Sequence, residues 1–488
     1  MEWENYVVKI NVKSKMIDLN HPLNTFNTEA SSGTGFFIEK NIILTNYHVV
    51  KYAFNIEVIY KQTNIIQAKV QHIFPDDDLA LIILEKIVDD CNILDFKVIT
   101  TKQIGTVHTI GFPLGSTNIK VTQGIISGFQ GSLIQTDAPI NPGNSGGPLV
   151  IKENDKYFLI GVNVSKMSGD AEGTGYVVPI YRFIILKEML KTNEIVICKP
   201  LMLFDFQKLI QDNLKEKLLK NHIEIQKNNT GIRITRINPK YYLNKYIKMN
   251  DVIISINSKQ VDIFGTIKFD FYPEKIPLKE LGLWFVVGDN ITIELLDPST
   301  QEIRKVSFPL EVIKTNYPEY YALENYPSYF VENNGLILSV ITKEHIRNFK
   351  DLNISNRSDI SRVLINRSNE NDILTVYLAD LDYNKLGKFI KYPIGEVIME
   401  INDKQFHTYE EFIKICSEPI TKIKTFSGKI FYVDNVPKVE IQTKEIKQTD
   451  EPKVNNIGLL DKVAKIMSTP ELVKHMNRTQ YAINYLQF

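Results

Sequence analysis

Cysteine is scarce in this chain of 488 residues. The three cysteines, Cys91, Cys198 and Cys416, lie far apart and form no CxxC pair. This spacing argues against a disulfide scaffold and gives no indication of a zinc site, and it fits a reducing compartment. We therefore expect neither a metal nor another cofactor.

The chain also lacks an excess of charge of one sign. Lys and Arg together number 57, as do Asp and Glu, so the net charge is zero. A nucleic-acid partner is not expected, because such partners favour a basic excess. No apolar run approaches the ~18 residues of a membrane-spanning helix, and Met1–Ile10 is too polar for a signal peptide. These features predict no membrane partner and an intracellular protein, cytoplasmic or nuclear.

What is present is an ordinary globular composition, with 43% hydrophobic and 23% charged residues. The length suggests three or four domains. Short strand-like runs punctuated by turn residues fill residues 1–190 and predict a β-barrel or sandwich. The pattern then changes, because Ile180–Leu190 and Phe206–Lys220 have the apolar spacing of helices.

One short sequence occurs twice in the second half. V-I-I-S-I-N-S-K-Q at Val252–Gln260 returns as V-I-M-E-I-N-D-K-Q at Val397–Gln405, with six of nine positions identical. Such self-similarity predicts two copies of one small domain type. Beyond Thr443 a charged segment leads to two helix-like stretches, Leu459–Met467 and Pro470–Leu486.

The stretch Ile140–Val150, I-N-P-G-N-S-G-G-P-L-V, places Ser145 among small residues just before an apolar run. A nucleophilic serine needs an exposed hydroxyl and backbone N–H groups beside it to hold an oxyanion. The glycines allow the sharp backbone that such a turn requires. The alternative is a Pro/Gly turn with an incidental serine.

A nucleophilic serine also needs a base and an acid. Among the eight histidines, His48 ends an apolar strand among small polar residues, whereas His72 and His108 lie within strand-like runs and are expected to be packed or half-exposed. Asp78 directly precedes the strand Leu79–Leu84, so we expect it to be the buried member of a run of three aspartates. A packed or surface histidine and a solvated acidic turn are the alternatives. The order His, Asp, Ser is that of two-barrel serine proteases.

Several motifs together resemble the HtrA/Deg family of serine endopeptidases over residues 1–190: T-N-Y-H-V-V, D-L-A-L-I, V-T-Q-G-I-I-S-G, Q-T-D-A-P-I-N-P-G-N-S-G-G-P-L and G-T-G-Y-V-V-P-I. The resemblance implies a catalytic triad of His48, Asp78 and Ser145. It also implies C-terminal PDZ domains, in agreement with the internal repeat. The oxyanion hole would be formed by the N–H groups of Gly143, Asn144 and Ser145.

The expected fold is therefore mainly β. A chymotrypsin-like protease domain of two six-stranded β-barrels would occupy residues 1–195. Two α+β PDZ-like domains would follow at 196–315 and 316–450, the second divergent, and a linker with a helical tail at 451–488. Pro327–Leu338 and Phe264–Phe269 resemble the eukaryotic Deg branch known from plants.

The first PDZ-like domain departs from the family in its carboxylate-binding loop. The matching segment Pro200–Phe204 has Leu203 where glycine is common, which argues against capture of peptide C-termini. Packing of Met202, Leu203 and Phe204 in the domain core is the alternative. The second domain has no recognisable loop of this kind, so we expect a structural or assembly role for it.

An apolar substrate preference is predicted from the residues before Ser145. Proteases that select Lys or Arg commonly carry an acid six residues before the nucleophile, where this chain has Pro139. Asp137 belongs to the shared T-D-A-P motif and is expected to be structural. We expect the substrate cleft to be lined by Ile140, Asn163, Val164 and Ser165. The last three of these would pair with the substrate as an added strand.

Two segments are expected to act in activation and assembly. The glycine-rich Ser168–Gly175 should be mobile, and the resemblance implies that it orders on activation. Lys13–Ser31, with Leu23 and Phe26, is a candidate for the apolar contacts of a trimer, the alternative being an ordinary surface loop. The predicted function is ATP-independent hydrolysis of unfolded or damaged proteins by a homo-trimer or higher homo-oligomer. The competing function is that of a catalytically silent PDZ scaffold or holdase chaperone.

Overall fold

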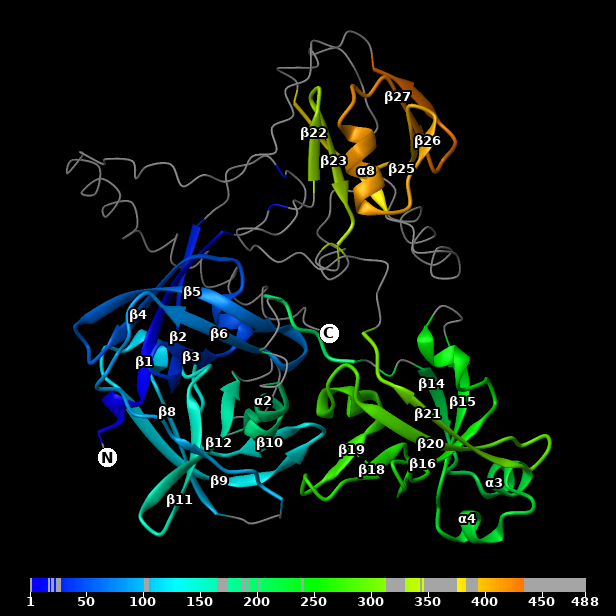
Figure 1. The fold of residues 1–488 in the computed structure, drawn as a ribbon, viewed down its shortest axis with the longest axis horizontal. Coiled ribbons are helices and arrows are strands. Elements are labelled where there is room, and N and C mark those ends of the chain that lie inside the picture. Colours follow the sequence, from blue (N-terminus) through cyan, green and yellow to red (C-terminus); the bar gives the residue numbers. More distant parts are fainter. Residues whose placement is uncertain are drawn as a thin grey trace, which may run out of the picture.

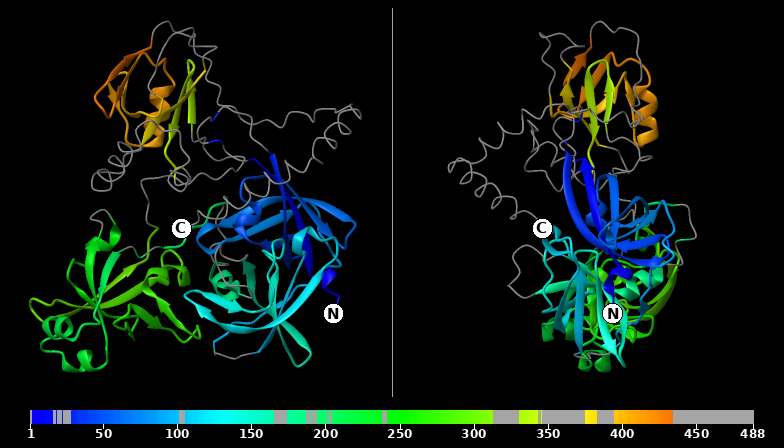
Figure 2. Two further views of the ribbon diagram at one scale, coloured as in Figure 1. Left: turned by 180° about the vertical axis from the view of Figure 1, so that it is seen from behind. Right: turned by 90° about the vertical axis from the view of Figure 1, so that its left-hand side faces the viewer.

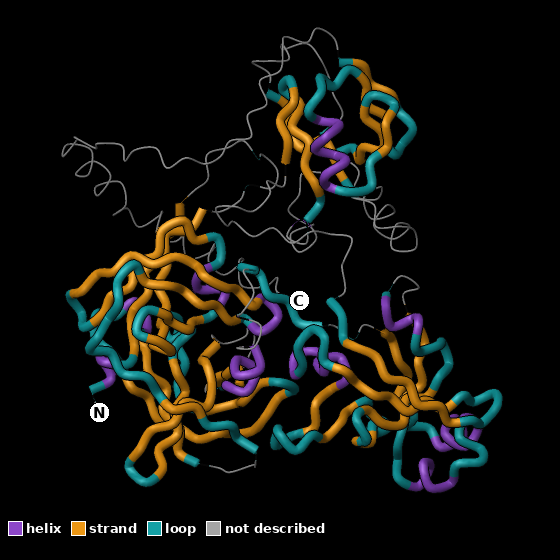
Figure 3. Tube along the Cα trace, in the orientation of Figure 1, coloured by secondary structure: helices purple, strands orange, loops and turns teal. Residues whose placement is uncertain are grey.

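The computed structural model describes residues 2–433, with gaps at 16–17, 19–21, 23–27, 101–104, 165–173, 187–189, 191–193, 201, 203, 238–240, 313–329, 343–344, 346–374 and 383–393. Within this part the chain is dominated by antiparallel strands (Figures 1 and 3). No helix in the described residues is long and apolar enough to cross a membrane. The helical stretches expected at Leu459–Met467 and Pro470–Leu486, and the whole tail 451–488, lie outside these ranges.

Six strands near the N-terminus close into a first barrel in the order β1-β2-β3-β6-β5-β4. Apolar residues alternate along β1, where Val8, Ile10 and Val12 are almost fully buried, because every second side chain of a barrel strand points inward. The elements are η1 (Trp3–Asn5), β1 (Val7–Lys15), β2 (Thr28–Glu39), β3 (Ile42–Thr45), α1 (Tyr47–Val50), β4 (Ala53–Tyr60), β5 (Asn64–Phe74), η2 (Pro75–Asp77) and β6 (Leu79–Leu84).

The next strands form a second ring of six in the order β11-β8-β9-β10-β13-β12, closed by the pairing of β11 with β12, and β7 adds to β12. The predicted fold of two six-stranded barrels is thus confirmed. Of the helix expected at Ile180–Leu190, the structure describes Ile180–Leu186 as α-helix, and 187–189 lie outside the described residues. The elements are β7 (Asp95–Phe96), β8 (Thr106–Gly111), η3 (Pro113–Gly115), β9 (Lys120–Gln130), β10 (Leu133–Thr136), β11 (Pro148–Glu153), β12 (Lys156–Val164), β13 (Gly175–Pro179) and α2 (Ile180–Leu186).

The two barrels pack directly on one another, as the views in Figures 1 and 2 show. One apolar cluster contains Phe36 and Leu44 of the first barrel together with Ile110, Val150 and Leu159 of the second. The interface is therefore a continuous hydrophobic core, which fixes the turns of one barrel relative to those of the other.

The central module, which we define as residues 202–310, is built on a sheet of order β14-β15-β16-β20-β21. The helix expected over Phe206–Lys220 is wrong in its first part, since Phe206 and Gln207 pair with β15 as strand residues. The elements are β14 (Phe204–Lys208), α3 (Asp212–Leu218), α4 (Ile223–Lys227), β15 (Ile232–Ile237), η5 (Tyr242–Lys245), β16 (Val252–Ile256), β17 (Lys259–Gln260), β18 (Thr266–Lys268), β19 (Lys275–Pro277), η6 (Leu278–Trp284), β20 (Asn290–Leu296) and β21 (Ile303–Pro309).

A further sheet, with the order β22-β23-β24-β25-β27-β28, forms the C-terminal module at residues 330–433. Its helix α8 buries Phe412 and Cys416 against the sheet. The elements are β22 (Phe330–Asn333), β23 (Leu336–Val340), β24 (Val376–Leu381), β25 (Val397–Ile401), β26 (Lys404–Gln405), α8 (Tyr409–Cys416), β27 (Lys422–Thr425) and β28 (Ile430–Tyr432).

The two copies of the sequence repeat form the same local structure. Val252–Gln260 folds into the β16–β17 hairpin and Val397–Gln405 into the β25–β26 hairpin. Both hairpins turn through two residues of positive φ, 49° and 61° in the first and 50° and 60° in the second. This is the geometry of the tight turns that match the twist of paired strands.

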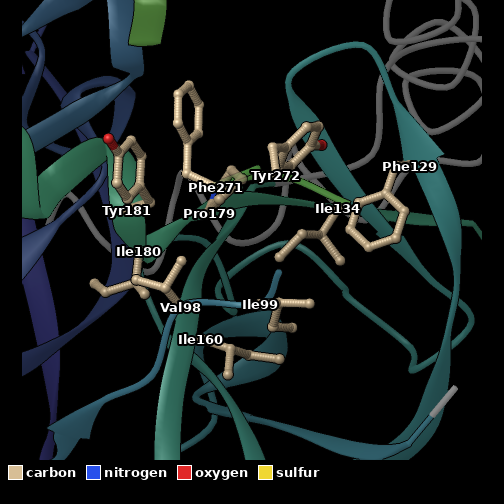
Figure 4. Close-up of a pocket in the computed structure, with 10 residues that line it drawn as sticks. All are labelled: Val98, Ile99, Phe129, Ile134, Ile160, Pro179, Ile180, Tyr181, Phe271 and Tyr272. Atoms are coloured by element: carbon tan, nitrogen blue, oxygen red, sulfur yellow. The ribbon is translucent and has the colours of Figure 1, made fainter. Parts of the chain in front are cut away.

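The central module docks on the second barrel through the tip of the β9–β10 hairpin. The Trp284 indole N–H donates to Ser132 Oγ at 2.9 Å, and the Ser132 main-chain N–H donates to the Glu280 carboxylate at 2.6 Å. Tyr181 stacks on Phe271 of the module, with ring centroids 4.9 Å apart. A small apolar pocket marks this interface and is lined by side chains of both units (Figure 4).

Candidate active site

His48 and Asp78 meet at one end of the first barrel. His48 lies on α1, the short helix after β3, and Asp78 ends the turn η2 before β6. His48 Nδ1 is 2.7 Å from Asp78 Oδ2, and the His48 main-chain N–H donates to Asp78 Oδ1 at 2.9 Å. Because Nδ1 faces the carboxylate, the opposite ring nitrogen is the one placed to accept a proton.

Main-chain contacts hold the aspartate from the other side. The Asp78 carbonyl accepts the Asn46 side-chain amide at 2.9 Å and the Tyr47 N–H at 3.1 Å. Three successive residues, Asn46 to His48, therefore bind Asp78, which fixes the imidazole relative to the carboxylate.

The expectation that Asp78 is the buried aspartate of its run is wrong. The side chain of Asp78 is 30% exposed and that of His48 is 38% exposed. The fully buried member is Asp77, whose side chain is 0% exposed and accepts Arg182 Nε at 2.6 Å. The position before a strand did not identify the buried residue, because Arg182 comes from a distant part of the chain.

Ser145 lies in a tight loop of the second barrel that abuts the first barrel. Its carbonyl accepts the Thr34 N–H at 2.9 Å. Gly146 has φ +82°, and a Cβ there would be 2.2 Å from both the Thr34 carbonyl oxygen and Thr45 Oγ1. Glycine is therefore required, and the close approach places the residue after Ser145 against Thr45, which precedes the turn carrying His48.

Two carbonyl groups of the loop are anchored on either side of Gly143. The Pro142 carbonyl accepts the Leu114 N–H at 2.6 Å, and the Gly143 carbonyl accepts Thr34 Oγ1 at 2.6 Å. Since C=O and N–H point in opposite directions across a trans peptide, the Gly143 N–H points away from Leu114.

The expectation for the Asn144 N–H is not met. This group donates to the Asn141 carbonyl at 2.9 Å, inside the turn itself. Two of the three N–H groups expected to hold an oxyanion remain candidates, those of Gly143 and Ser145. The sequence did not reveal this, because the direction of a single amide depends on the turn geometry.

The expected cleft residues have different environments. Ile140 is 2% exposed and its side chain lies against Gly175. The N–H and carbonyl of Asn163 are bonded to Gly147 and Gly146 at 2.9 and 3.0 Å, so its main chain supports the Ser145 loop and is not available to a substrate strand. Val164 is half-buried opposite Tyr176.

Several residues with an expected role are not described by the structure. Ser165, Leu23 and Phe26 lie outside the described residues, as does most of Ser168–Gly175. The Asp137 carboxylate accepts the Ile125 N–H at 2.6 Å, as expected of a structural residue.

His72 is buried, and His108 is half-buried with its pKa lowered by burial, as expected. Met202 and Phe204 pack in the core of the central module, which agrees with the core-packing alternative for that segment; Leu203 is not described.

Residues that support the site from a distance could not be identified from the local sequence. Thr34 bonds to the Ser145 loop at two points, and Arg182 and Lys199 surround Asp77. Thr34 lies in the G-T-G that precedes an apolar run, and Arg182 follows G-T-G-Y-V-V-P-I. Proximity to these motifs was the available indication, but their partners come from other segments.

Two packed six-stranded barrels, with a histidine–aspartate pair on one and a serine in a glycine-rich loop on the other, define a chymotrypsin-like serine protease fold. A family model described as a trypsin-like peptidase domain matches residues 33–162.

Named proteases are among the relatives. "Putative protease Do-like 13" of Arabidopsis thaliana is 30% identical over 308 residues, covering 60% of this chain and 60% of the relative. "Putative protease Do-like 3, mitochondrial" of the same plant is 30% identical over 293 residues, covering 57% and 50%. "Serine protease Do-like HtrA" of Bacillus subtilis (strain 168) is 27% identical over 314 residues, covering 57% and 64%.

A solved structure of an HtrA-type protease with a decapeptide superposes with a TM-score of 0.49 at 21% identity, covering 64% of this chain and 95% of that one. The trypsin-like domain match and the Do-like and HtrA relatives support a serine protease of HtrA/Deg type. The matched part spans 50% to 64% of the lengths of the three relatives above.

Proposed function

We propose that this chain is an ATP-independent serine endopeptidase with Ser145 as nucleophile, His48 as general base and Asp78 as the acid that orients the base. The observation that carries the proposal is the two-point contact of His48 with Asp78, at 2.7 Å through Nδ1 and 2.9 Å through the main chain. This contact selects the tautomer in which the other ring nitrogen accepts a proton.

In the proposed reaction, Ser145 Oγ attacks the carbonyl carbon of the scissile peptide while His48 takes its proton. The oxyanion of the tetrahedral intermediate is held by the N–H groups of Gly143 and Ser145. His48 then gives the proton to the leaving amine, and an acyl-serine remains. Water, deprotonated by His48, hydrolyses this ester and regenerates Ser145, while Asp78 stays ionised throughout.

The substrates in this proposal are unfolded or damaged proteins, cleaved after apolar residues. The support is the absence of an acid six residues before Ser145, where Pro139 stands, and the apolar Ile140 that follows. Peptides that differ only before the cleaved bond test this preference. Faster cleavage after Lys than after Leu would contradict it.

The remaining assignments belong to the same proposal. Residues 1–195 form the protease domain, 196–315 and 316–450 are PDZ-type domains, and 451–488 form a linker and tail. A homo-trimer or higher oligomer, assembled through Lys13–Ser31, acts in the cytoplasm or nucleus. Sedimentation tests the assembly, and a monomer at micromolar concentration would count against it.

The main test replaces Ser145 by Ala and follows hydrolysis of casein by the full chain. Ser127→Ala is the matched control, because Ser127 is an exposed serine on β9 of the same barrel. We expect hydrolysis to disappear in the first variant and to persist in the second. Hydrolysis that survives Ser145→Ala would disprove the nucleophile. A wild type that suppresses aggregation of a client without cleaving it would favour the holdase function.

A further inference from the structure

Three charged side chains are buried together: Asp77 from the turn before β6, Arg182 from α2, and Lys199 from the segment 195–199 that precedes the central module. The side chains of Asp77, Arg182 and Lys199 are 0%, 3% and 1% exposed. Burying ions costs several kcal/mol each, and apolar residues of similar volume are often equally good for stability. Stability alone therefore does not account for a cluster of this kind beside a catalytic turn.

Arg182 and Lys199 of this cluster bind the turn that ends at Asp78. Arg182 Nε donates to Asp77 Oδ1 at 2.6 Å, and its Nη2 donates to the Asp76 carbonyl at 3.0 Å. The Lys199 main-chain N–H donates to Asp76 Oδ2 at 2.8 Å, and its ammonium is 3.9 Å from Asp77 Oδ2. Both residues that precede Asp78 are thus held by side chains from elsewhere in the chain.

Asp78 itself needs such support. Its backbone is left-handed, with φ 51° and ψ 41°. For a residue other than glycine this conformation costs roughly 1–2 kcal/mol, and it persists only where the surroundings impose it. The left-handed backbone also sets the direction in which the Asp78 carboxylate leaves the turn toward His48.

The segment 195–199, which carries Lys199, is hydrogen-bonded to the end of β5 just before the same turn. The Ile73 N–H donates to the Ile195 carbonyl at 2.7 Å, and the Ile197 N–H donates to the Ile73 carbonyl at 2.9 Å. Residues 195–197 are therefore fixed beside Ile73 at the end of β5 by a parallel β-bridge, two residues before the turn begins. Lys199 reaches the cluster from this fixed segment.

The ammonium of Lys199 also contacts the central module. Lys199 Nζ donates to the Phe285 carbonyl at 3.3 Å, directly after Trp284, which anchors the module on Ser132. Tyr181, next to Arg182, stacks on Phe271 of the module, and both rings line the interface pocket (Figure 4). One ammonium thus lies between the module and the aspartate turn.

We propose that Lys199 is a positioning residue, through which docking of the central module holds the Asp76–Asp78 turn in the form that presents Asp78 to His48. The inference rests on the proposed function of that pair. If the central module undocks, the Lys199 ammonium loses its hydrogen bond to the Phe285 carbonyl. It then shares the fully buried Asp77 carboxylate with the Arg182 guanidinium. Burial already lowers the pKa of Lys199 to about 8, so the cluster tolerates little further loss of partners.

The test uses the full chain and three variants. Lys199→Met removes the ammonium and keeps an unbranched chain, and Lys199→Arg restores a positive charge. Lys259→Met is the control, since Lys259 forms an exposed ion pair with Asp270 at 2.7 Å in the same module. The readouts are kcat and KM for a peptide substrate and the rate at which a small fluorophosphonate labels Ser145.

We expect Lys199→Met to lower kcat and the labelling rate together by about tenfold, with KM almost unchanged, because the defect lies in the catalytic groups and not in substrate binding. Lys199→Arg should recover part of the loss, and Lys259→Met should behave as wild type. A folded Lys199→Met protein with wild-type kcat and labelling rate would overturn the inference. A wild type that is not labelled would refute the proposed function instead.

If Lys199→Met does not fold, two other variants test whether docking of the central module affects the aspartate turn. Trp284→Phe and Ser132→Ala each remove the 2.9 Å bond that anchors the module and leave the aspartate turn untouched. Slower labelling of Ser145 in both supports the coupling. Wild-type labelling in both would show that the turn holds its form without the docked module.

Discussion

Replacement of Thr34 by valine tests how the two barrels hold the nucleophile loop. Thr34 is fully buried, and its hydroxyl makes two hydrogen bonds. It donates to the Gly143 carbonyl at 2.6 Å and accepts the Phe112 N–H at 3.1 Å. Valine has nearly the same shape, so the perturbation is the loss of these two bonds alone.

The expected loss of stability follows from the burial of both partners. A buried donor or acceptor without a partner costs about 1–3 kcal/mol, so two of them amount to roughly 2–6 kcal/mol. Thr34→Ser is the matched control, because it keeps the hydroxyl and loses one methyl group, at a cost of about 1 kcal/mol. The valine variant should therefore be the less stable of the two.

Activity should fall in the same order. In Thr34→Val the Gly143 carbonyl loses its hydrogen-bond donor. The Gly143 N–H, which is proposed to hold the oxyanion, is then less precisely positioned. Removal of one oxyanion donor costs about 10²–10³ in kcat, so a misplaced donor should cost about tenfold or more. KM should change little, because Thr34 is fully buried and its side chain is not accessible to a substrate.

The assay exploits the two tryptophans of the chain. Trp3 packs edge-on against Tyr157 of the second barrel, with centroids 4.9 Å apart, whereas Trp284 belongs to the central module. In a Trp284→Phe background the fluorescence of Trp3 reports unfolding of the barrels in urea. Equal midpoints and equal kcat for Thr34→Val and Thr34→Ser would refute the reasoning.

Three further predictions concern the same region. Gly146→Ala should destabilise the barrels by about 3 kcal/mol or more, measured by the same fluorescence, because its Cβ would lie 2.2 Å from the Thr34 carbonyl; Gly128→Ala, where the nearest atom is 4.0 Å away, is the control and should change little. Asp78→Asn should preserve the fold but lower kcat by about 10⁴, since an amide favours the wrong tautomer of His48; a loss below tenfold would contradict the role of Asp78. Burial lowers the pKa of Lys199 from 10.5 to about 8, so between these values the unfolded chain binds more protons and this lysine makes stability rise with pH. From pH 8 to 10 the wild type should therefore gain on the order of 2 kcal/mol relative to Lys199→Met in urea unfolding, and parallel pH profiles would contradict this.

The sequence was sufficient where the determinants are local. Short strand-like runs punctuated by turn residues predicted the barrel strands. The repeat predicted two copies of one domain type, and its two copies fold into hairpins that are alike down to the left-handed turn residues Asn257 and Asn402. The segment around Phe206 was misjudged because a few apolar residues fit both a helix and a strand. Pairing with β15 decided in favour of the strand there.

Long-range determinants were beyond such reasoning. Asp76, Asp77 and Asp78 are chemically identical neighbours, and only the arrival of Arg182 and Lys199 distinguishes the buried one. The Asn144 N–H looked equivalent to its neighbours until the turn directed it to Asn141. In both cases the sequence identified the right stretch, and contacts with distant residues determined the role of each atom.

These contacts share one arrangement, in which the Ser145 loop and the Asp78 turn are each held by residues from other segments of the chain. The Ser145 loop is held by Thr34 of the first barrel, and the Asp78 turn by Arg182 and Lys199, which follow the second barrel. These crossed contacts add to the hydrophobic core between the barrels in opposing relative motion of the turns that carry Ser145 and His48. It follows that substitutions at these supporting residues should reduce kcat more than KM, whereas substitutions at Val164, which the sequence predicts to line the substrate cleft, should raise KM more than they reduce kcat.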